Sequence, residues 1–270
     1  MEKIINYKII GNGRPLLLIH GWAMNAEVWE TFINSLSANY QVISIDLRGH
    51  GKSKQLDGPF NYEVFAKDIR LLINKLELKD LTLIGWSMGV SVILKMLEQP
   101  LPLPFLNSLV FISGNPSLVK RADYENGIPE VVVKRLYKNT ERDFEKGLQT
   151  FHNLLFTPEE LTHIKQMNIF KIITDKNNIP KKEAALESLK CLQNEDLRDT
   201  IEKIAAPLLL IHGKNDQISL SDAAVYMNKR IRKSELLLLD DTGHVPFITK
   251  EKETLEKLKI FLKTNDVRNR

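Results

Sequence analysis

The feature that most constrains the fold of this chain is a Gly-Trp-Ser-Met-Gly motif centred on Ser87. A short apolar run, 81–84, leads into the motif, and a helical run, 90–98, follows it. This strand–turn–helix context is typical of a nucleophile elbow, where the backbone turns sharply and small residues flank the serine. The serine oxygen then stands at the N-terminus of a helix, which supplies amide donors and the positive end of a dipole. The motif predicts a nucleophilic serine, although an ordinary turn serine can carry the same pattern.

Short apolar runs alternate with helical patterns along much of the chain. The candidate strands are 16–20, 42–46, 81–85, 109–113, 208–212 and 236–240. Continuous rather than alternating apolarity indicates strands that are covered on both faces, and helical stretches such as 62–76 suit right-handed crossovers. We therefore predict an α/β fold with a mostly parallel central sheet flanked by helices. We also expect an edge hairpin around the glycines at 11–13, before the first strand.

The alternation stops between 113 and 208, where helical patterns replace the buried runs. Thr157, Pro158 and Glu160 fit an N-cap, a proline at the first helical position and a capping-box glutamate. A second helix opens after Pro180 and runs towards Leu192. We predict a core formed by residues 1–114 and 196–270, and a helical cap (lid) formed by the insertion 115–195.

A serine hydroxyl needs a base, and the base needs a carboxylate that orients it. In sheets of this type the order along the chain is serine, acid, histidine. Among six histidines, His244 follows the last predicted strand, from which it can reach back to Ser87. Asp216 follows the strand before, whereas Asp240 and Asp241 read as a strand end and a helix cap. We predict Ser87, Asp216 and His244 as catalytic, with Asp216 holding the imidazole tautomer.

The developing oxyanion of such a reaction needs preorganised N–H donors. The backbone N–H of Met88, directly after the serine, is one candidate. The second is the backbone N–H of Trp22, in the loop after the first predicted parallel strand. Gly21 in that loop can also be a plain turn glycine.

Composition and charge exclude several other classes of protein. The 270 residues include one cysteine, Cys191, which excludes an internal disulfide framework and a cysteine-based zinc site. Residues 250–270 hold seven basic and four acidic residues and account for most of the net charge of +4. The longest uncharged stretch, 99–119, contains four prolines and is a poor membrane helix. We expect a cytoplasmic monomer without metal, cofactor, membrane or nucleic-acid partner.

Together these motifs resemble the α/β-hydrolase family over nearly the whole chain. The matching segments are the His20-Gly21 loop, 46–53, the elbow, Gly213-x-x-Asp216 and Gly243-His244. Residues 20–29 and 244–248, with Trp86, Asp143, Phe144 and Phe151, more closely resemble the pimeloyl-[acyl-carrier protein] methyl ester esterase family of biotin synthesis.

This resemblance implies a serine carboxylesterase that hydrolyses the methyl ester of a pimeloyl-[acyl-carrier protein]. The substrate-binding residues that it implies are Trp22, Ser87, Met88, Phe151, Leu155 and His244. Arg142 and Lys146 fall where that family presents basic cap residues to its acidic carrier protein. The sequence departs from the family at Leu155, where a glutamine is expected. The segment 120–146 is also close to neutral, with seven basic and six acidic residues.

Two other classes of function fit the same motifs. A general short-chain esterase or a carbon–carbon bond hydrolase would use the same catalytic set under a different lid pocket. A ligand receptor can also be built on this fold, although an intact serine, aspartate and histidine set argues against it. Dehalogenases and epoxide hydrolases resemble this chain but carry aspartate at the position of Ser87.

Overall fold

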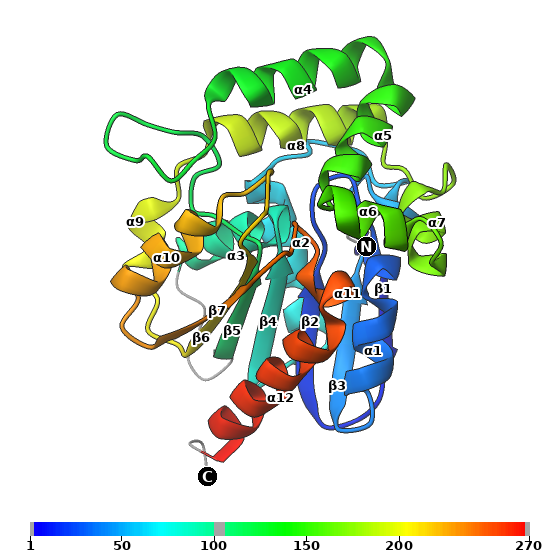
Figure 1. Cartoon of the computed structure of the whole chain (residues 1–270). Helices are drawn as coiled ribbons and strands as arrows, with labels where there is room; N and C mark the ends of the chain where they lie inside the picture. The colour runs from blue at the N-terminus through cyan, green and yellow to red at the C-terminus, as the bar shows by residue number, and fades with distance from the viewer. Residues whose placement is uncertain (1–2, 100–105, 268–270) are drawn as a thin grey trace.

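A mostly parallel sheet forms the centre of the molecule. The computed structural model describes residues 3–99 and 106–267 (Figure 1). The strands are β1 (Tyr7–Ile10), β2 (Arg14–Ile19), β3 (Tyr40–Ile45), β4 (Leu81–Trp86), β5 (Leu106–Ile112), β6 (Leu208–Gly213) and β7 (Ser234–Leu239). Their order in the sheet is β1-β3-β2-β4-β5-β6-β7, and every described neighbouring pair except β1 with β3 is parallel. The six predicted strands correspond to β2–β7, which confirms the predicted fold class.

The expected edge hairpin is wrong, because β1 does not pair with β2. Gly11 and Gly13 do turn the chain at positive φ, but β1 then pairs antiparallel with β3, with Tyr7 opposite Ile45. Strand β2 pairs with β3 on one side and with β4 on the other. Since both edges of β2 are occupied, the first strand lies at the free edge of β3.

Helices cover both faces of the sheet, which explains the continuous apolar runs of its strands. All six residues of β4 are buried. Figure 1 shows α1 and α12 on one face and α2 and α3 on the other. The described helices outside the inserted segment are η1 (Ala26–Trp29), α1 (Glu30–Leu36), η2 (Gly51–Ser53), α2 (Tyr62–Lys75), α3 (Met88–Leu97), α9 (Arg198–Ile201), α10 (Ser221–Arg230), α11 (Pro246–Thr249) and α12 (Glu251–Val267).

The cap helices lie between β5 and β6 in the chain and above the carboxyl ends of the strands (Figure 1). They are α4 (Glu130–Arg142), α5 (Phe144–Leu154), α6 (Pro158–Ile164), α7 (Asn168–Thr174) and α8 (Lys182–Asn194). The predicted capping box at Thr157 and Glu160 is present at the start of α6. The inserted helical segment is thus confirmed, whereas its boundaries at 115 and 195 stay a prediction.

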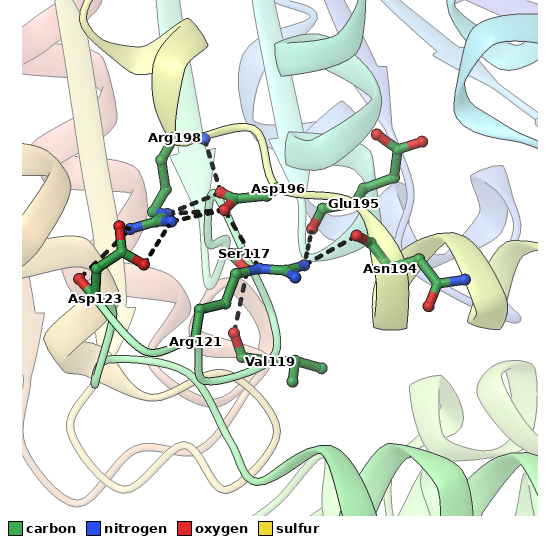
Figure 2. A network of polar contacts seen from close by, with 8 residues as sticks. All are labelled: Ser117, Val119, Arg121, Asp123, Asn194, Glu195, Asp196 and Arg198. Carbon is green, nitrogen blue, oxygen red and sulfur yellow. Dashed lines mark hydrogen bonds and ion pairs between the residues drawn. The ribbon is translucent and has the colours of Figure 1, made fainter.

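A polar network joins the two connections between cap and core (Figure 2). The guanidinium of Arg121, on the outgoing connection, donates to the carbonyls of Asn194 and Glu195, at 2.9 and 3.1 Å. Arg198, after the returning connection, donates to Asp196 at 2.7 Å and to Asp123 at 2.9 Å. We call this set of contacts the cap clamp, because it ties the two connections to each other.

Within 3–99 and 106–267, no helix combines the length and the apolarity that a membrane crossing needs. Three prolines of the uncharged stretch, Pro100, Pro102 and Pro104, lie outside the described residues. The last residues of the basic segment, 268–270, also lie outside them.

Candidate active site

The Gly-x-Ser-x-Gly motif forms a sharp turn between β4 and α3. Ser87 adopts a φ of +54°, in the left-handed region that is strained for a side-chain-bearing residue. The flanking positions require glycine because neighbouring backbone atoms occupy the space that a Cβ would need. A Cβ on Gly89 would overlap the carbonyl oxygen of Ile19, and one on Gly85 would lie 2.8 Å from the Gly89 carbonyl carbon. The turn therefore holds the Ser87 hydroxyl at the carboxyl end of the sheet.

The three predicted catalytic side chains form a hydrogen-bonded line. Ser87 Oγ lies 2.8 Å from His244 Nε2, and His244 Nδ1 lies 2.7 Å from Asp216 Oδ2. They come from the segments after β4, β7 and β6, which meet because parallel strands end at the same edge. His244 and Asp216 are buried, whereas Ser87 is half-buried. The alternative acid Asp240 instead pairs with Lys214 at the surface.

Asp216 is held by several donors besides His244. Its Oδ1 accepts hydrogen bonds from the backbone N–H groups of Ile218 and Ser219, at 2.9 and 3.0 Å. Burial by itself raises the pKa of Asp216, but the charge of His244 and hydrogen bonds from His212 and His244 outweigh it and hold the pKa below its usual range. The carboxylate therefore stays ionised and keeps the imidazole oriented.

His212 is a residue of this site that the sequence analysis missed. Its Nε2 lies 3.1 Å from Asp216 Oδ2 and 2.7 Å from the carbonyl oxygen of Ser219. Both partners are acceptors, so Nε2 carries a proton. The spacing of four residues between His212 and Asp216 was the available signal, but it shows contact only when the turn after β6 is known.

The two candidate oxyanion donors belong to segments that lie next to Ser87. Met88 is the first residue of α3, so its N–H belongs to the first turn, where donors have no partner within the helix. A Cβ on Gly21 would lie 3.2 Å from the Ser87 Cβ, which places the loop bearing Trp22 directly against the elbow. Both segments thus adjoin Ser87, and the role of their N–H groups as donors to the oxyanion of an ester attacked by Ser87 stays a prediction.

A buried histidine fixes the orientation of the Trp22 loop. His20 Nδ1 donates to the Gly21 carbonyl at 2.8 Å, and His20 Nε2 accepts from the Leu47 N–H at 3.0 Å. Burial lowers the pKa of His20 to about 4, although the bond to Gly21 raises it. The ring is therefore neutral with a fixed tautomer. Because the peptide is trans, holding the Gly21 carbonyl directs the Trp22 N–H to the opposite side.

The implied substrate-binding residues of the cap lie close to this loop. The indole N–H of Trp22 donates to the Ala185 carbonyl in α8 at 2.9 Å. The Trp22 ring meets the Phe151 ring edge to face, with centroids 4.6 Å apart. Leu155 is buried, and its carbonyl accepts the His244 N–H at 2.8 Å. The implied docking residues Arg142 and Lys146 are exposed.

Two larger cavities lie away from this line of residues. One of about 670 Å³, between α5 and α7, is lined by Lys146, His152 and Lys165 among others. The other, of about 470 Å³, lies beside β1 and α1. Neither lining includes Ser87 or His244. Among the residues that the structure describes, no cluster of three or more histidine, cysteine or acidic side chains could hold a metal ion.

Known proteins are similar to this chain both in sequence and in architecture. The α/β hydrolase fold family model matches residues 14–251. A pimeloyl-[acyl-carrier protein] methyl ester esterase of Nitrosomonas europaea is 30% identical over 247 residues, covering 91% of this chain and 94% of that protein. A putative non-heme chloroperoxidase of Synechocystis is 30% identical over 244 residues, covering 89% and 88%. An esterase structure from Exiguobacterium antarcticum has a TM-score of 0.85 at 29% identity, covering 96% of this chain and 95% of that one. The chain therefore belongs to the α/β-hydrolase family, as a serine hydrolase of the esterase type with Ser–His–Asp triad geometry.

Proposed function

We propose that the chain is a carboxylesterase in which Ser87 is the nucleophile, His244 the general base and Asp216 the orienting acid. The observation that carries this proposal is the continuous line from Ser87 Oγ through His244 to Asp216, with contacts of 2.8 and 2.7 Å. A half-buried hydroxyl beside a buried imidazole, itself held by an ionised carboxylate, has the groups that acyl transfer requires.

In the proposed reaction His244 Nε2 takes the hydroxyl proton as Ser87 Oγ attacks the ester carbonyl carbon. The backbone N–H groups of Trp22 and Met88 stabilise the tetrahedral oxyanion. His244 then gives its proton to the departing methoxide, so methanol leaves and the acyl group stays on Ser87. A water deprotonated by His244 attacks this acyl-enzyme, and the serine recovers its proton as the carboxylic acid leaves. Asp216 holds the imidazole in one tautomer throughout.

The substrate that we propose is pimeloyl-[acyl-carrier protein] methyl ester, which places the enzyme in biotin synthesis. The esterase of Nitrosomonas europaea that bears this substrate in its name matches the chain over 91% of its length. Trp22 and Phe151, in contact at the site, supply an apolar wall for an acyl chain. Leu155 would complete that wall, and the proposed cap, 115–195, would cover it.

Arg142 and Lys146 are the proposed contacts for the acidic carrier protein. Arg142 ends α4, and Lys146 lies in the first turn of α5. Both side chains are exposed. Long-range steering depends on where charges are placed as well as on their sum, so a nearly neutral cap can still attract an acidic partner.

The test compares two substrates, pimeloyl-[acyl-carrier protein] methyl ester and p-nitrophenyl acetate. We expect the wild type to prefer the carrier-bound ester, and Ser87→Ala to lose about a thousandfold or more in kcat on both. The double charge reversal Arg142→Glu, Lys146→Glu should raise KM for the carrier-bound ester by about tenfold, without affecting p-nitrophenyl acetate. Lys263→Glu, at an exposed position of α12, is the control and should leave both KM values unchanged.

Each other result identifies an alternative. Activity on the short ester alone would leave a general esterase, or another hydrolase with the same triad, and would remove the carrier protein. Normal activity of Ser87→Ala would show that the nucleophile is assigned wrongly. Tight binding of the carrier-bound ester without turnover would indicate a receptor.

A further inference from the structure

The backbone of His244 is held from two sides. Its N–H donates to the Leu155 carbonyl at 2.8 Å, and its own carbonyl accepts the indole N–H of Trp86 at 2.9 Å. Trp86 belongs to the elbow, whereas Leu155 belongs to the cap. One of the two bonds that fix the His244 backbone therefore comes from the inserted segment.

Glu160 makes a second bond from the cap to the same loop. Its Oε2 accepts the Thr157 N–H at 2.9 Å, which closes the capping box of α6. The same oxygen accepts the N–H of Gly243 at 3.0 Å. The side chain that caps α6 thus also binds Gly243, the residue directly before His244. Gly243 lies 83 positions after Glu160 in the chain.

The close approach of the cap depends on glycine at position 243. A Cβ on Gly243 would lie 2.8 Å from both Glu160 Oε2 and the Leu155 carbonyl oxygen. On the other side, the Gly243 carbonyl packs so closely on Gly213 that a Cβ there would overlap it. The loop that carries His244 is therefore enclosed between the end of β6 and the cap.

We propose that Glu160 is a positioning residue for His244, and that the cap segment 155–160 sets where the imidazole stands relative to Ser87. This inference rests on the proposed role of His244 as the general base, but on no particular substrate. Loss of the Glu160 bond leaves the Leu155 carbonyl to hold the cap side of the loop, so the imidazole samples positions away from Ser87. Small displacements of this kind cost catalysis even when the displaced group remains close.

The experiment separates positioning from helix capping. Glu160→Ala removes both bonds of Oε2, whereas Thr157→Ala removes only the threonine half of the capping box, the bond from the Glu160 N–H to Thr157 Oγ1. Glu160→Gln keeps an acceptor oxygen at the same reach. Glu160→Asp keeps the charge but is one methylene too short, and it serves as the second variant if Glu160→Ala does not fold. The substrate is p-nitrophenyl acetate, which is too small to depend on an acyl pocket, and circular dichroism confirms that each variant is folded.

We expect Glu160→Ala and Glu160→Asp to lower kcat by about 10–100-fold with little change in KM. Thr157→Ala should stay within about twofold of the wild type, and Glu160→Gln should recover most of the lost kcat. Equal kcat values for Glu160→Ala and Thr157→Ala would overturn the inference, because the glutamate would then act as a helix cap alone. Activity that survives in Ser87→Ala would instead refute the proposed function, so the two failures are distinguishable.

Discussion

The cap clamp gives a stability prediction that can be worked out from its geometry. Arg198→Met removes the guanidinium, which lies 5.2 Å from the centre of the Tyr124 ring, but keeps an unbranched apolar side chain. The change breaks two short bonds to Asp196, of 2.8 and 2.7 Å, and a forked pair to Asp123, of 2.9 and 3.0 Å (Figure 2). Asp196 keeps its contact with Arg121, at 3.3 Å, and the hydrogen bond from the backbone N–H of residue 198, also at 3.3 Å.

Exposure decides which of these bonds contributes to the free energy of unfolding. The Asp123 side chain is 74% exposed, so water screens its pair with Arg198 and we expect little from it. The side chains of Arg198 and Asp196 are 16% and 29% exposed. Sheltered hydrogen bonds to charged groups contribute about 1.5–3 kcal/mol and exposed ion pairs about 0–1 kcal/mol, so we expect a loss of about 2 kcal/mol. For a chain of this size that lowers Tm by about 4–6 °C.

The pH dependence of this loss has a definite sign. Hydrogen bonds from Arg198 lower the pKa of Asp196 and that of Asp123, although some desolvation opposes them. A carboxylate with a lowered folded-state pKa stabilises the fold above its unfolded pKa of about 3.9, and this contribution disappears as pH falls through the folded value. The difference between wild type and Arg198→Met should therefore be constant from about pH 7 to 5 and shrink below about pH 4.

The assay is urea unfolding of both proteins at about pH 7, 5 and 3.5. The control is Lys257→Met, which breaks the surface ion pair of 2.6 Å with Glu235. We expect this control to change the free energy of unfolding by less than about 0.5 kcal/mol. Equal stability of Arg198→Met and wild type at neutral pH would refute the argument from burial. A difference that persists in full at the lowest pH would refute the electrostatic origin.

Two further predictions concern the support of the triad. His212→Leu removes a donor from Asp216 and should lower kcat by about tenfold, the effect of about 1.4 kcal/mol. A carboxylate with one donor fewer stabilises an imidazolium more strongly, so the acidic limb of the pH–rate profile should move to higher pH in His212→Leu. His212→Gln should partly reverse this shift. An unmoved limb would mean that His212 contributes packing but no hydrogen bond that affects the reaction. Trp86→Phe leaves the buried His244 carbonyl without its donor and opens a small cavity, so we expect a loss of about 2–4 kcal/mol in thermal unfolding together with a lower kcat. Wild-type stability would contradict it.

The sequence predicted the sheet and the meeting of the triad residues because both follow from topology. A strand covered on both faces needs an unbroken apolar run, as in β2, β4 and β6. In parallel strands the carboxyl ends coincide, so residues that follow β4, β6 and β7 lie together although 157 positions separate Ser87 from His244. The apolar pattern of each strand, taken by itself, was therefore sufficient to predict the sheet and the place where the residues after its strands meet.

The pairing of β1 and the roles of His212 and Glu160 could not be predicted, because they depend on contacts that no single segment of the sequence indicates. The glycines at 11–13 predict a turn, but the partner of β1 depends on which strand has a free edge. His212 reads as a strand end, because the direction of its ring toward Asp216 depends on the turn that follows. Glu160 is fully accounted for by the capping box of α6, so nothing local indicates that its oxygen also binds Gly243.

The contacts of the cap show why its position and the chemistry of the site belong together. Beyond the clamp, the Lys181 N–H donates to the Gly49 carbonyl at 2.8 Å, and Glu187 accepts the Phe60 N–H at 3.0 Å. These bonds fix the start of α8, whose Ala185 carbonyl receives the indole N–H of Trp22. A cap that swung away as one body would break all of these bonds together with those that hold the His244 loop. Under the proposed roles, an opened cap would remove the Leu155 and Glu160 bonds to the His244 loop and the Ala185 partner of the Trp22 indole, leaving only the core contacts of both. We therefore expect catalysis to be most efficient with the cap in the docked position.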